Sequence, residues 1–373
     1  MPSRRPAVQD PNAEAPIELF VPGRLCLFGE HSDWAGTYRK SHPALAPGRC
    51  LVAGTDQGLL GVAAREDGAV VLESRRADGA RRAPVRLSPS VDALDAAATR
   101  GDFWAHAAGA AAEVVARFGV AGISLKIRSD LPERAGLSSS AAVCVLVVRA
   151  YSRAYDLGLA GEDEMALAYA GERRTGSACG RMDQVCALGR GVTALSFDGD
   201  AVEIEPVRVG GDLPFLIVDL RRGKDTPRIL RDLRACYPDA PGALAARVRE
   251  ALGPANRALH VRARAALERG DAGSLGSLMT EAQARFDRDV APASPALASP
   301  ALHALLAHPA LGELALGAKG VGSQGDGCAQ VLCRGESERR ELARRLEREL
   351  GVACLPLTPT RREAAVSPAP AAP

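Results

Sequence analysis

The serine-rich segment LPERAGLSSSAAV, residues 131–143, combines residue types that suit a phosphate group. Residues 123–127 before it alternate apolar and polar side chains as a half-buried strand does, and residues 141–154 after it favour a helix. Gly136 can adopt backbone angles closed to other residues, so the loop can wrap around an anion at the positive end of the helix dipole. The serine hydroxyls can add hydrogen bonds or a magnesium ligand. The alternative is a serine N-cap with small residues for packing.

A second segment, PGRLCLFGEHSDWAG, places several polar side chains in a turn after a short apolar run. The carboxylates of Glu30 and Asp33 can accept hydrogen bonds from a polyol, and Arg24 and His31 can donate them. Trp34 offers a flat apolar face to a sugar ring, or it packs in the core. The alternative for the whole cluster is a charged turn with internal salt bridges.

Two further segments carry recognisable chemistry. GAKGVGSQGDG, residues 317–327, has five glycines in eleven residues between a helical run and a strand-like run. Such a loop allows close approach of the backbone to another strand or to phosphates. GERRTGSACGRMDQ, residues 171–184, ends in an aspartate that follows a glycine-containing loop.

In this order the segments resemble the motifs of the GHMP kinases, the superfamily of galactokinase, homoserine kinase, mevalonate kinase and phosphomevalonate kinase. The first segment is similar to its galactokinase form, and MDQ looks like the end of the galactokinase segment that carries the catalytic aspartate. The resemblance runs over residues 22–331. It implies an α+β fold with an N-terminal domain like ribosomal protein S5 domain 2, a ferredoxin-like C-terminal domain and an active site between them.

The resemblance also implies catalytic roles. Asp183 matches the aspartate that faces the substrate hydroxyl, where a carboxylate can accept the proton or orient the hydroxyl for attack on the γ-phosphate of ATP. Arg24 matches the arginine beside the transferring phosphoryl group, where a fixed positive charge suits an oxygen-rich transition state. We expect these two residues to form the catalytic pair.

Magnesium and nucleotide sites follow from the same resemblance. Ser140 and Glu172 match the Mg²⁺ ligands, and one hydroxyl and one carboxylate are a reasonable protein share for this ion. The alternative for Glu172 is a helix-surface residue paired with Arg173 or Arg174. The expected ATP-binding residues are Pro132, Gly136, Leu137, Ser138, Ser139, Ser140, Ala141, Gly322, Ser323 and Gly325.

The first motif carries most of the information on the substrate. Galactokinases usually read GRxNxIGEHxDYxGG, so the expected substrate-binding residues are Glu30, His31, Asp33, Trp34 and Asp183. This pattern favours a sugar over mevalonate or homoserine, with the anomeric hydroxyl of galactose or a related sugar as the acceptor. Cys26, Trp34 and Thr37 depart from the pattern.

Three other features of the sequence leave alternatives open. The basic residues of the 37–49 loop, with His42, either recognise an acidic or longer sugar or form a solvated loop. Gln324 and Asp326 interrupt the usual glycine run of the third motif, which leaves its detailed phosphate role open. Lys224, in the segment RRGKDT at the end of a strand, binds a phosphate or an acidic substrate, or belongs to an ordinary charged loop.

The predicted function is therefore an ATP- and Mg²⁺-dependent sugar kinase. The alternatives are a kinase for a heptose, an octose, a uronic acid or mevalonate, and a sugar-sensing regulator on the same scaffold. Intact Asp183 and Arg24 argue against the regulator.

Composition limits the partners. With 47 basic and 45 acidic residues, nothing in the charge balance indicates a nucleic-acid or membrane surface. The partner that the resemblance implies is a small-molecule sugar. Nine cysteines without metal-binding spacing are expected to be reduced core residues of a cytoplasmic protein. No signal peptide or membrane span is evident. Monomer and homodimer both remain open.

The length favours two domains, which we predict at residues 17–210 and 211–360, with disordered tails at 1–16 and 361–373. Residues 334–349 alternate acids and bases at helical spacing and predict a solvated amphipathic helix. The expected strands are 51–64, 70–74, 123–127, 192–204, 215–220 and 329–332, and the other expected helical segments are 141–154, 162–173 and 241–267.

Overall fold

A computed structural model describes residues 15–76, 79–131 and 136–359 of the 373-residue chain. The predicted tails lie outside these residues, apart from Ala15 and Pro16. Pro132, one of the expected nucleotide-binding residues, also lies outside them.

The first half of the described chain forms a seven-stranded mixed sheet in the order β4-β3-β5-β2-β6-β7, with β1 paired to β2. The long strand β2 is central because it pairs antiparallel with β1, β5 and β6 in turn. The strands are β1 (Ile17–Phe28), β2 (Gly48–Glu66), β3 (Val70–Arg76), β4 (Arg81–Leu87), β5 (Gly122–Ser129), β6 (Val192–Asp198) and β7 (Ala201–Val207).

One strand prediction needs a correction. The run 192–204 was expected to be a single strand, but it forms the hairpin of β6 and β7. Gly199 in the turn has a φ of +60°, a conformation that glycine adopts without steric cost. The alternation of apolar residues continues through the turn, so periodicity alone does not reveal the break.

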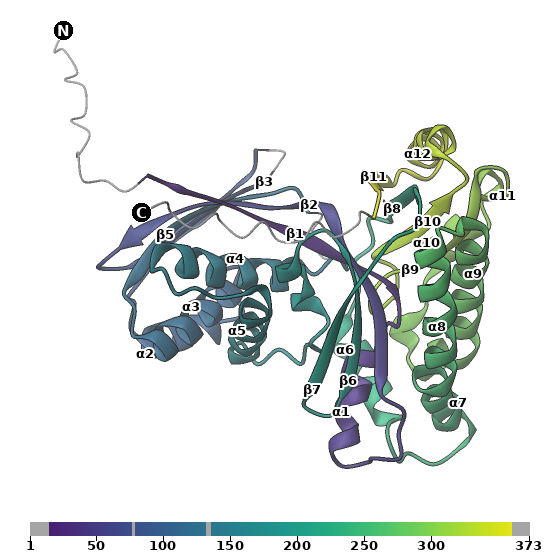
Figure 1. The fold of residues 1–373 in the computed structure, drawn as a ribbon, viewed down its shortest axis with the longest axis horizontal. Helices are drawn as coiled ribbons and strands as arrows, with labels where there is room; N and C mark the ends of the chain where they lie inside the picture. Colours follow the sequence, from purple (N-terminus) through teal and green to yellow (C-terminus); the bar gives the residue numbers. More distant parts are fainter. Residues whose placement is uncertain (1–14, 77–78, 132–135, 360–373) are drawn as a thin grey trace, which may run out of the picture.

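Four helices cover one face of this sheet (Figure 1). Helix α4 packs directly on β1 and β2, and α3 packs on α4 and α5. The close contact of α3 with α5 depends on small residues, because a Cβ atom on Gly171 would lie 2.5 Å from the Cα of Ala110. The sequence predicted α4 and α5 but not α2 or α3. The helices are α2 (Val91–Ala98), α3 (Ala105–Phe118), α4 (Ser139–Ala154) and α5 (Gly161–Arg174).

The second half contains a four-stranded antiparallel sheet in the order β11-β8-β10-β9. Numbered along the chain, this order is 4-1-3-2, which with the crossing helices gives the expected ferredoxin-like arrangement. Its elements are β8 (Phe215–Asp219), α6 (Thr226–Ala235), β9 (Ala315–Gly320), β10 (Cys328–Cys333), α12 (Glu336–Leu350) and β11 (Ala353–Leu357).

A largely helical stretch is inserted between α6 and β9. Its helix α8 packs against β2 of the first sheet, and α9 packs against β9 of the second (Figure 1). The predicted helical stretch at 241–267 is interrupted at Gly253, where α7 ends. The elements are α7 (Ala243–Leu252), α8 (Pro254–Arg269), α9 (Ala272–Asp289), η3 (Ala291–Ala293), η4 (Pro295–Leu297), α10 (Pro300–Leu306) and α11 (Pro309–Leu314).

Strand β9 corrects a second expectation, because residues 317–320 were expected to belong to a glycine-rich loop. The helical run expected before this segment is present, since α11 ends at Leu314. Alanine and leucine favour a helix locally and glycine favours a loop, but pairing with β10 and packing on α9 select a strand. Gly276 of α9 lies against Leu316 and Gly317 of β9, with no space for a Cβ atom on either glycine. Tertiary packing therefore decides this element.

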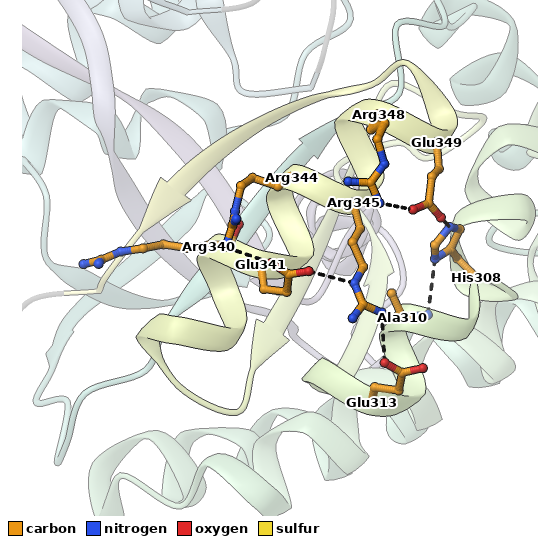
Figure 2. A network of polar contacts seen from close by, with 9 residues as sticks. All are labelled: His308, Ala310, Glu313, Arg340, Glu341, Arg344, Arg345, Arg348 and Glu349. Carbon is orange, nitrogen blue, oxygen red and sulfur yellow. Dashed lines mark hydrogen bonds and ion pairs between the residues drawn. The ribbon is translucent and has the colours of Figure 1, made fainter.

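Helix α12 lies at the surface as predicted. Only Leu342 and Leu346 are buried along it. Figure 2 shows its outer face, where arginines and glutamates pair with one another and with the neighbouring α11. Arg345, for example, lies 2.9 Å from Glu341 and from Glu313. Exposed ion pairs of this kind contribute about 0–1 kcal/mol each to stability. The helix is therefore stabilised mainly by solvation of its charged face and by burial of the two leucines.

The two sheets share a hydrophobic core. Its largest cluster joins Leu25 and Val145 of the first half to Ile217 and Leu332 of the second. The domain bounds at 17–210 and 211–360 stay a prediction. No helix in the described parts of the chain is long and apolar enough to cross a membrane.

Candidate active site

A cavity of about 1180 Å³ lies where the two halves meet. It is larger than the roughly 300–1,000 Å³ typical of a site for one small ligand, so it has room for two. Side chains reach it from β1, α1 (Ser32–Thr37), α4, α5, η2 (Asp183–Leu188) and α6, and the third motif completes its wall. The sequence motifs therefore converge on one cavity.

Arg24 and Asp183 form a direct ion pair in this cavity. Arg24 lies in the second half of β1, and its side chain is only 4% exposed. Asp183 is the first residue of η2, and its side chain is 25% exposed. The Nε and Nη1 atoms of Arg24 are buried and have no hydrogen-bond partner among the described residues. Buried unpaired donors are costly, so an anionic ligand at this position would stabilise the site.

The serine loop faces the same cavity at the start of α4. Gly136 has a φ of +89°, and Ser138, the N-cap residue, has a left-handed φ of 57°. Ser138, Ser139 and Ser140 line the cavity together with Gly136. The free N–H groups at the start of a 16-residue helix can bind a phosphate there.

The side chains of two other residues predicted to bind ATP do not face the cavity. The side chain of Leu137 is buried in the core, and its carbonyl oxygen accepts a hydrogen bond of 3.1 Å from the backbone N–H of Arg24. Ala141 is also fully buried. These residues position the loop, and neither side chain lines the cavity.

Glu172 lies beside Ser140 at the cavity wall. One carboxylate oxygen accepts a hydrogen bond of 3.0 Å from Ser140 Oγ, and the other accepts one of 2.7 Å from Gln184 Nε2. His106 Nε2 lies 3.8 Å from the same carboxylate. A hydroxyl and a carboxylate side by side are hard oxygen donors that fit the protein share of a Mg²⁺ site.

The alternative interpretation of Glu172 is wrong, because its neighbouring arginines have other partners. Arg174 pairs with Asp95 and Glu113. Arg173 donates a hydrogen bond of 2.7 Å to the carbonyl oxygen of Ser177. Glu172 itself is 2% exposed and points into the protein, away from the helix surface.

His31 connects the first motif to the third. Trp34 Nε1 donates a hydrogen bond of 3.1 Å to His31 Nδ1, so Nε2 carries the proton and donates to the carbonyl oxygen of Ser323 at 3.2 Å. Burial lowers the pKa of His31 to about 4, and Lys224 and Arg234 add to this effect. Both ring nitrogens are therefore engaged in a neutral imidazole that lines the cavity.

Asp33 lies in the cavity wall beneath the loop that leads to Asp183. A Cβ atom on Gly180 would overlap the Asp33 carboxylate, so this loop approaches closely only because the residue is glycine. Burial raises the pKa of Asp33, while hydrogen bonds from the backbone and the charge of Arg24 oppose this shift. The carboxyl group is well placed to accept a hydrogen bond from a hydroxylated ligand.

Glu30 does not line the cavity. It forms an ion pair with the buried Lys319 of β9, and its side chain is 8% exposed. The ion pair joins the turn after β1 to β9, the strand with which the third motif begins. A role of Glu30 in binding a sugar stays a prediction, and its contact in this structure is with Lys319.

The third motif turns only its middle part toward the cavity. Gly322 and Ser323 line the wall, whereas Gly325 packs against the backbone of Ala296. Gln324 accepts a hydrogen bond of 3.0 Å from Gln283. The carboxylate of Asp326 likewise accepts one of 3.1 Å from the backbone N–H of Leu302. The two residues that interrupt the glycine run therefore fix the loop to its helical surroundings.

The 37–49 loop lies apart from the cavity, since none of its basic residues lines the wall. These side chains pair with carboxylates elsewhere: Arg39 with Asp198, Lys40 with Asp200 and His42 with Asp239. The structure thus favours the solvated-loop interpretation of these charges.

Several cavity residues were not predicted from the sequence. His106 is one polar residue in an alanine-rich helix and carries no motif. Gln184, which is buried behind the cavity wall and bonds to Glu172, was part of the MDQ match but received no role. Arg231 and Arg234 of α6 line the cavity, and the Asp-Thr-Pro start of that helix is a typical N-terminal signal that could have been used.

The nine cysteines are all free thiols. Six are buried as expected, whereas Cys179, Cys236 and Cys354 are half-buried. No group of three or more His, Cys, Asp and Glu residues suited to hold a metal ion occurs within residues 15–76, 79–131 and 136–359.

Comparisons with known proteins agree with these motifs. The family model for the GHMP kinases N terminal domain matches residues 105–191. A galactokinase from Mycobacterium bovis is 30% identical over 233 residues, 62% of this chain and 57% of that protein. A mevalonate kinase from Aeropyrum pernix is 28% identical over 276 residues, 70% of this chain and 74% of that protein. The match to the mycobacterial relative thus spans little more than half of its length.

Solved structures show the same fold. The galactokinase of Lactococcus lactis, crystallised with galactose, superposes with a TM-score of 0.73 at 19% identity, covering 94% of this chain and 95% of that one. The L. major mevalonate kinase in complex with R-mevalonate gives a TM-score of 0.70 at 18% identity, covering 93% and 97%. Residues 105–191 are therefore a GHMP kinase N-terminal domain by their family match, and the chain as a whole has the GHMP kinase fold.

Proposed function

We propose that this protein is an ATP-dependent kinase that transfers the γ-phosphate to a sugar hydroxyl. The first candidate acceptor is the anomeric hydroxyl of galactose or a related sugar. The observation that carries this proposal is the Arg24–Asp183 pair, which lies in one cavity with the serine loop and with the first-motif residues His31, Asp33 and Trp34.

In this proposal Asp183 accepts the proton of the attacking hydroxyl or orients that hydroxyl toward the phosphorus. Arg24 holds Asp183 with one nitrogen and has its two unpaired donors available for the transferring phosphoryl oxygens. The start of α4 binds the phosphates, and Ser140 with Glu172 would hold Mg²⁺. The bound metal would neutralise developing charge on the phosphates.

The relatives support a sugar as the acceptor. The mycobacterial match is named a galactokinase, and the superposed Lactococcus lactis enzyme was crystallised with galactose. In this chain Asp33 and Trp34 lie at the wall of the cavity on the side of Asp183. A carboxyl group and an indole are a suitable pair for binding a sugar ring.

A sugar with an acidic substituent is the second candidate. Arg231 and Arg234 of α6 line the cavity next to Trp34, and the Arg234 guanidinium lies 5.7 Å from the Trp34 ring centre. One nitrogen of Arg234 donates to the carbonyl oxygen of Ala178, and its remaining donors form no ion pair among the described residues. A guanidinium in this position can bind a carboxylate or a phosphate.

A coupled ADP-release assay with ATP and Mg²⁺ tests the proposal across free sugars, uronic acids, heptoses and mevalonate. Galactose and galacturonic acid form a matched pair, since they differ only at C6. We expect turnover of a sugar, with NMR locating the phosphate on C1. Preference for galacturonic acid would support the acidic-substituent candidate. Turnover of mevalonate alone, or of no compound, would contradict the sugar-kinase proposal.

A further inference from the structure

Lys224 extends from the loop between β8 and α6 into the cavity. The loop is held in place from the third motif, because Gly327 N–H donates to the carbonyl oxygen of Arg222 at 3.1 Å and the carbonyl oxygen of Gly327 accepts from Leu220 N–H at 2.9 Å. Thr226 Oγ1 also lies 3.3 Å from Ser323 Oγ. The position of Lys224 is therefore fixed by the second half of the molecule.

The ammonium group lies between the two glycine-containing loops. A Cβ atom on Gly136 of the serine loop would lie 2.5 Å from Lys224 Nζ, and one on Gly322 of the third motif would lie 3.4 Å from it. Both glycines have positive φ angles, +89° and +63°. The absence of side chains at these two positions thus leaves the space that Nζ occupies.

The charge of Lys224 has no partner among the described residues. No hydrogen bond or ion pair of its Nζ occurs within the described ranges, whereas Arg24 in the same cavity pairs with Asp183. Burial lowers the pKa of Lys224 to about 8, and Arg24 contributes in the same direction. The side chain of Lys224 is half-buried, and the group is still mostly charged at neutral pH, so the cation is only partly solvated. An anionic ligand would supply the missing charge.

We propose that Lys224 binds the β- or γ-phosphate of the nucleotide, so that two cations from opposite halves of the molecule, Lys224 and Arg24, act on the polyphosphate. This inference rests on the proposed function. The main observation behind the inference is the position of Lys224 Nζ against Gly136 and Gly322. These glycines belong to the two loops that would hold the phosphates. A point charge on a flexible stem suits this role, since it can follow the phosphate oxygens.

The test compares nucleotides that differ only in phosphate number. Affinities for ATP, ADP and AMP are measured by isothermal titration calorimetry on the full chain, for the wild type and for Lys224→Met, Lys224→Arg and Arg222→Met. The methionine keeps the length of the lysine stem without its charge. Arg222→Met is the matched control, because Arg222 is an exposed cation of the same loop that does not line the cavity.

We expect Lys224→Met to weaken ATP binding by roughly 10- to 100-fold, the range for one charge-assisted contact, and to change AMP binding less than about twofold. Lys224→Arg should recover part of the ATP affinity, and Arg222→Met should bind as the wild type does. Far-UV circular dichroism of each variant checks the fold, and the arginine variant keeps the test decisive if the methionine variant does not fold.

Three outcomes would overturn the inference. Equal losses of ATP and AMP affinity would assign Lys224 a structural role. Unchanged ATP affinity with a raised KM for the sugar would place its contact on the substrate. If the wild-type chain binds no ATP at all, the proposed function itself fails, whereas either of the first two results leaves that function standing.

Discussion

At the scale of single residues, His31 combines an unusual backbone with an unusual charge state. Its left-handed φ of 66° turns the ring toward both Trp34 and Ser323. The two hydrogen bonds require one particular neutral tautomer, and burial keeps the pKa near 4. Protonation would lose the bond from Trp34, because Nδ1 could no longer accept it.

This arrangement predicts acid sensitivity. The folded-state pKa of His31 lies below its ordinary value of 6.5, so the stabilisation is complete above pH 6.5 and is lost as the pH falls toward 4. From pH 7.5 to pH 5 we expect the free energy of unfolding to fall by about 2 kcal/mol from this residue. His31→Asn, which tolerates the left-handed backbone, should be less stable at pH 7.5 but should lose less on acidification.

Urea unfolding of both proteins at pH 7.5 and pH 5 measures the difference. The same pH-dependent loss in the wild type and in His31→Asn would show that the histidine is not the titrating group.

Much of the site was predictable because motifs encode local chemistry. The prediction placed Asp183 and Arg24 in one site, and the structure brings them into direct contact. It also placed Ser140 with Glu172, which lie 3.0 Å apart. His106 could not be found in this way, because only the packing of α3 against α5 brings it to the carboxylate. Residues recruited by tertiary contact leave no local pattern.

At the scale of elements, a buried ion pair joins the turn after β1 to β9. Lys319 is 1% exposed and Glu30 is 8% exposed, so neither charge is compensated by water. Lys319 also donates to the carbonyl oxygen of Gly320 at 3.0 Å. The Glu30–Lys319 pair therefore holds the first motif against the start of the third motif.

Lys319→Met should destabilise the protein by about 3–5 kcal/mol, because it leaves the Glu30 carboxylate buried and unpaired. The double variant Glu30→Gln, Lys319→Met removes both charges and should regain most of that free energy. Urea unfolding of the wild type, both single variants and the double variant gives the coupling between the two sites. A loss below about 1 kcal/mol in Lys319→Met would indicate that water reaches the carboxylate.

Element prediction succeeded where periodicity was strong and failed where packing decided. The apolar run of α4 and the alternation of β5 were recognised within a few residues of their ends. Strand β9 was missed because its glycines and alanines have no strand-like pattern, and only α9 and β10 on either side select its conformation.

At the scale of the whole molecule, the shared core predicts cooperative unfolding. The main apolar cluster contains Leu25 and Ile217, which belong to different sheets, so neither half buries its apolar surface alone. We expect a single calorimetric transition whose van't Hoff and calorimetric enthalpies agree. Two resolved transitions would contradict this and would support two independently stable domains.

The account centres on phosphoryl transfer by the Arg24–Asp183 pair, and a comparison of the wild type with Asp183→Asn tests it most directly. The acceptor is the best substrate of the sugar panel, kcat is measured by ADP release, and ATP affinity is measured by calorimetry. The account predicts turnover by the wild type, a fall in kcat of about 10²- to 10⁴-fold in the variant, and little change in ATP affinity. Full turnover by Asp183→Asn would contradict it.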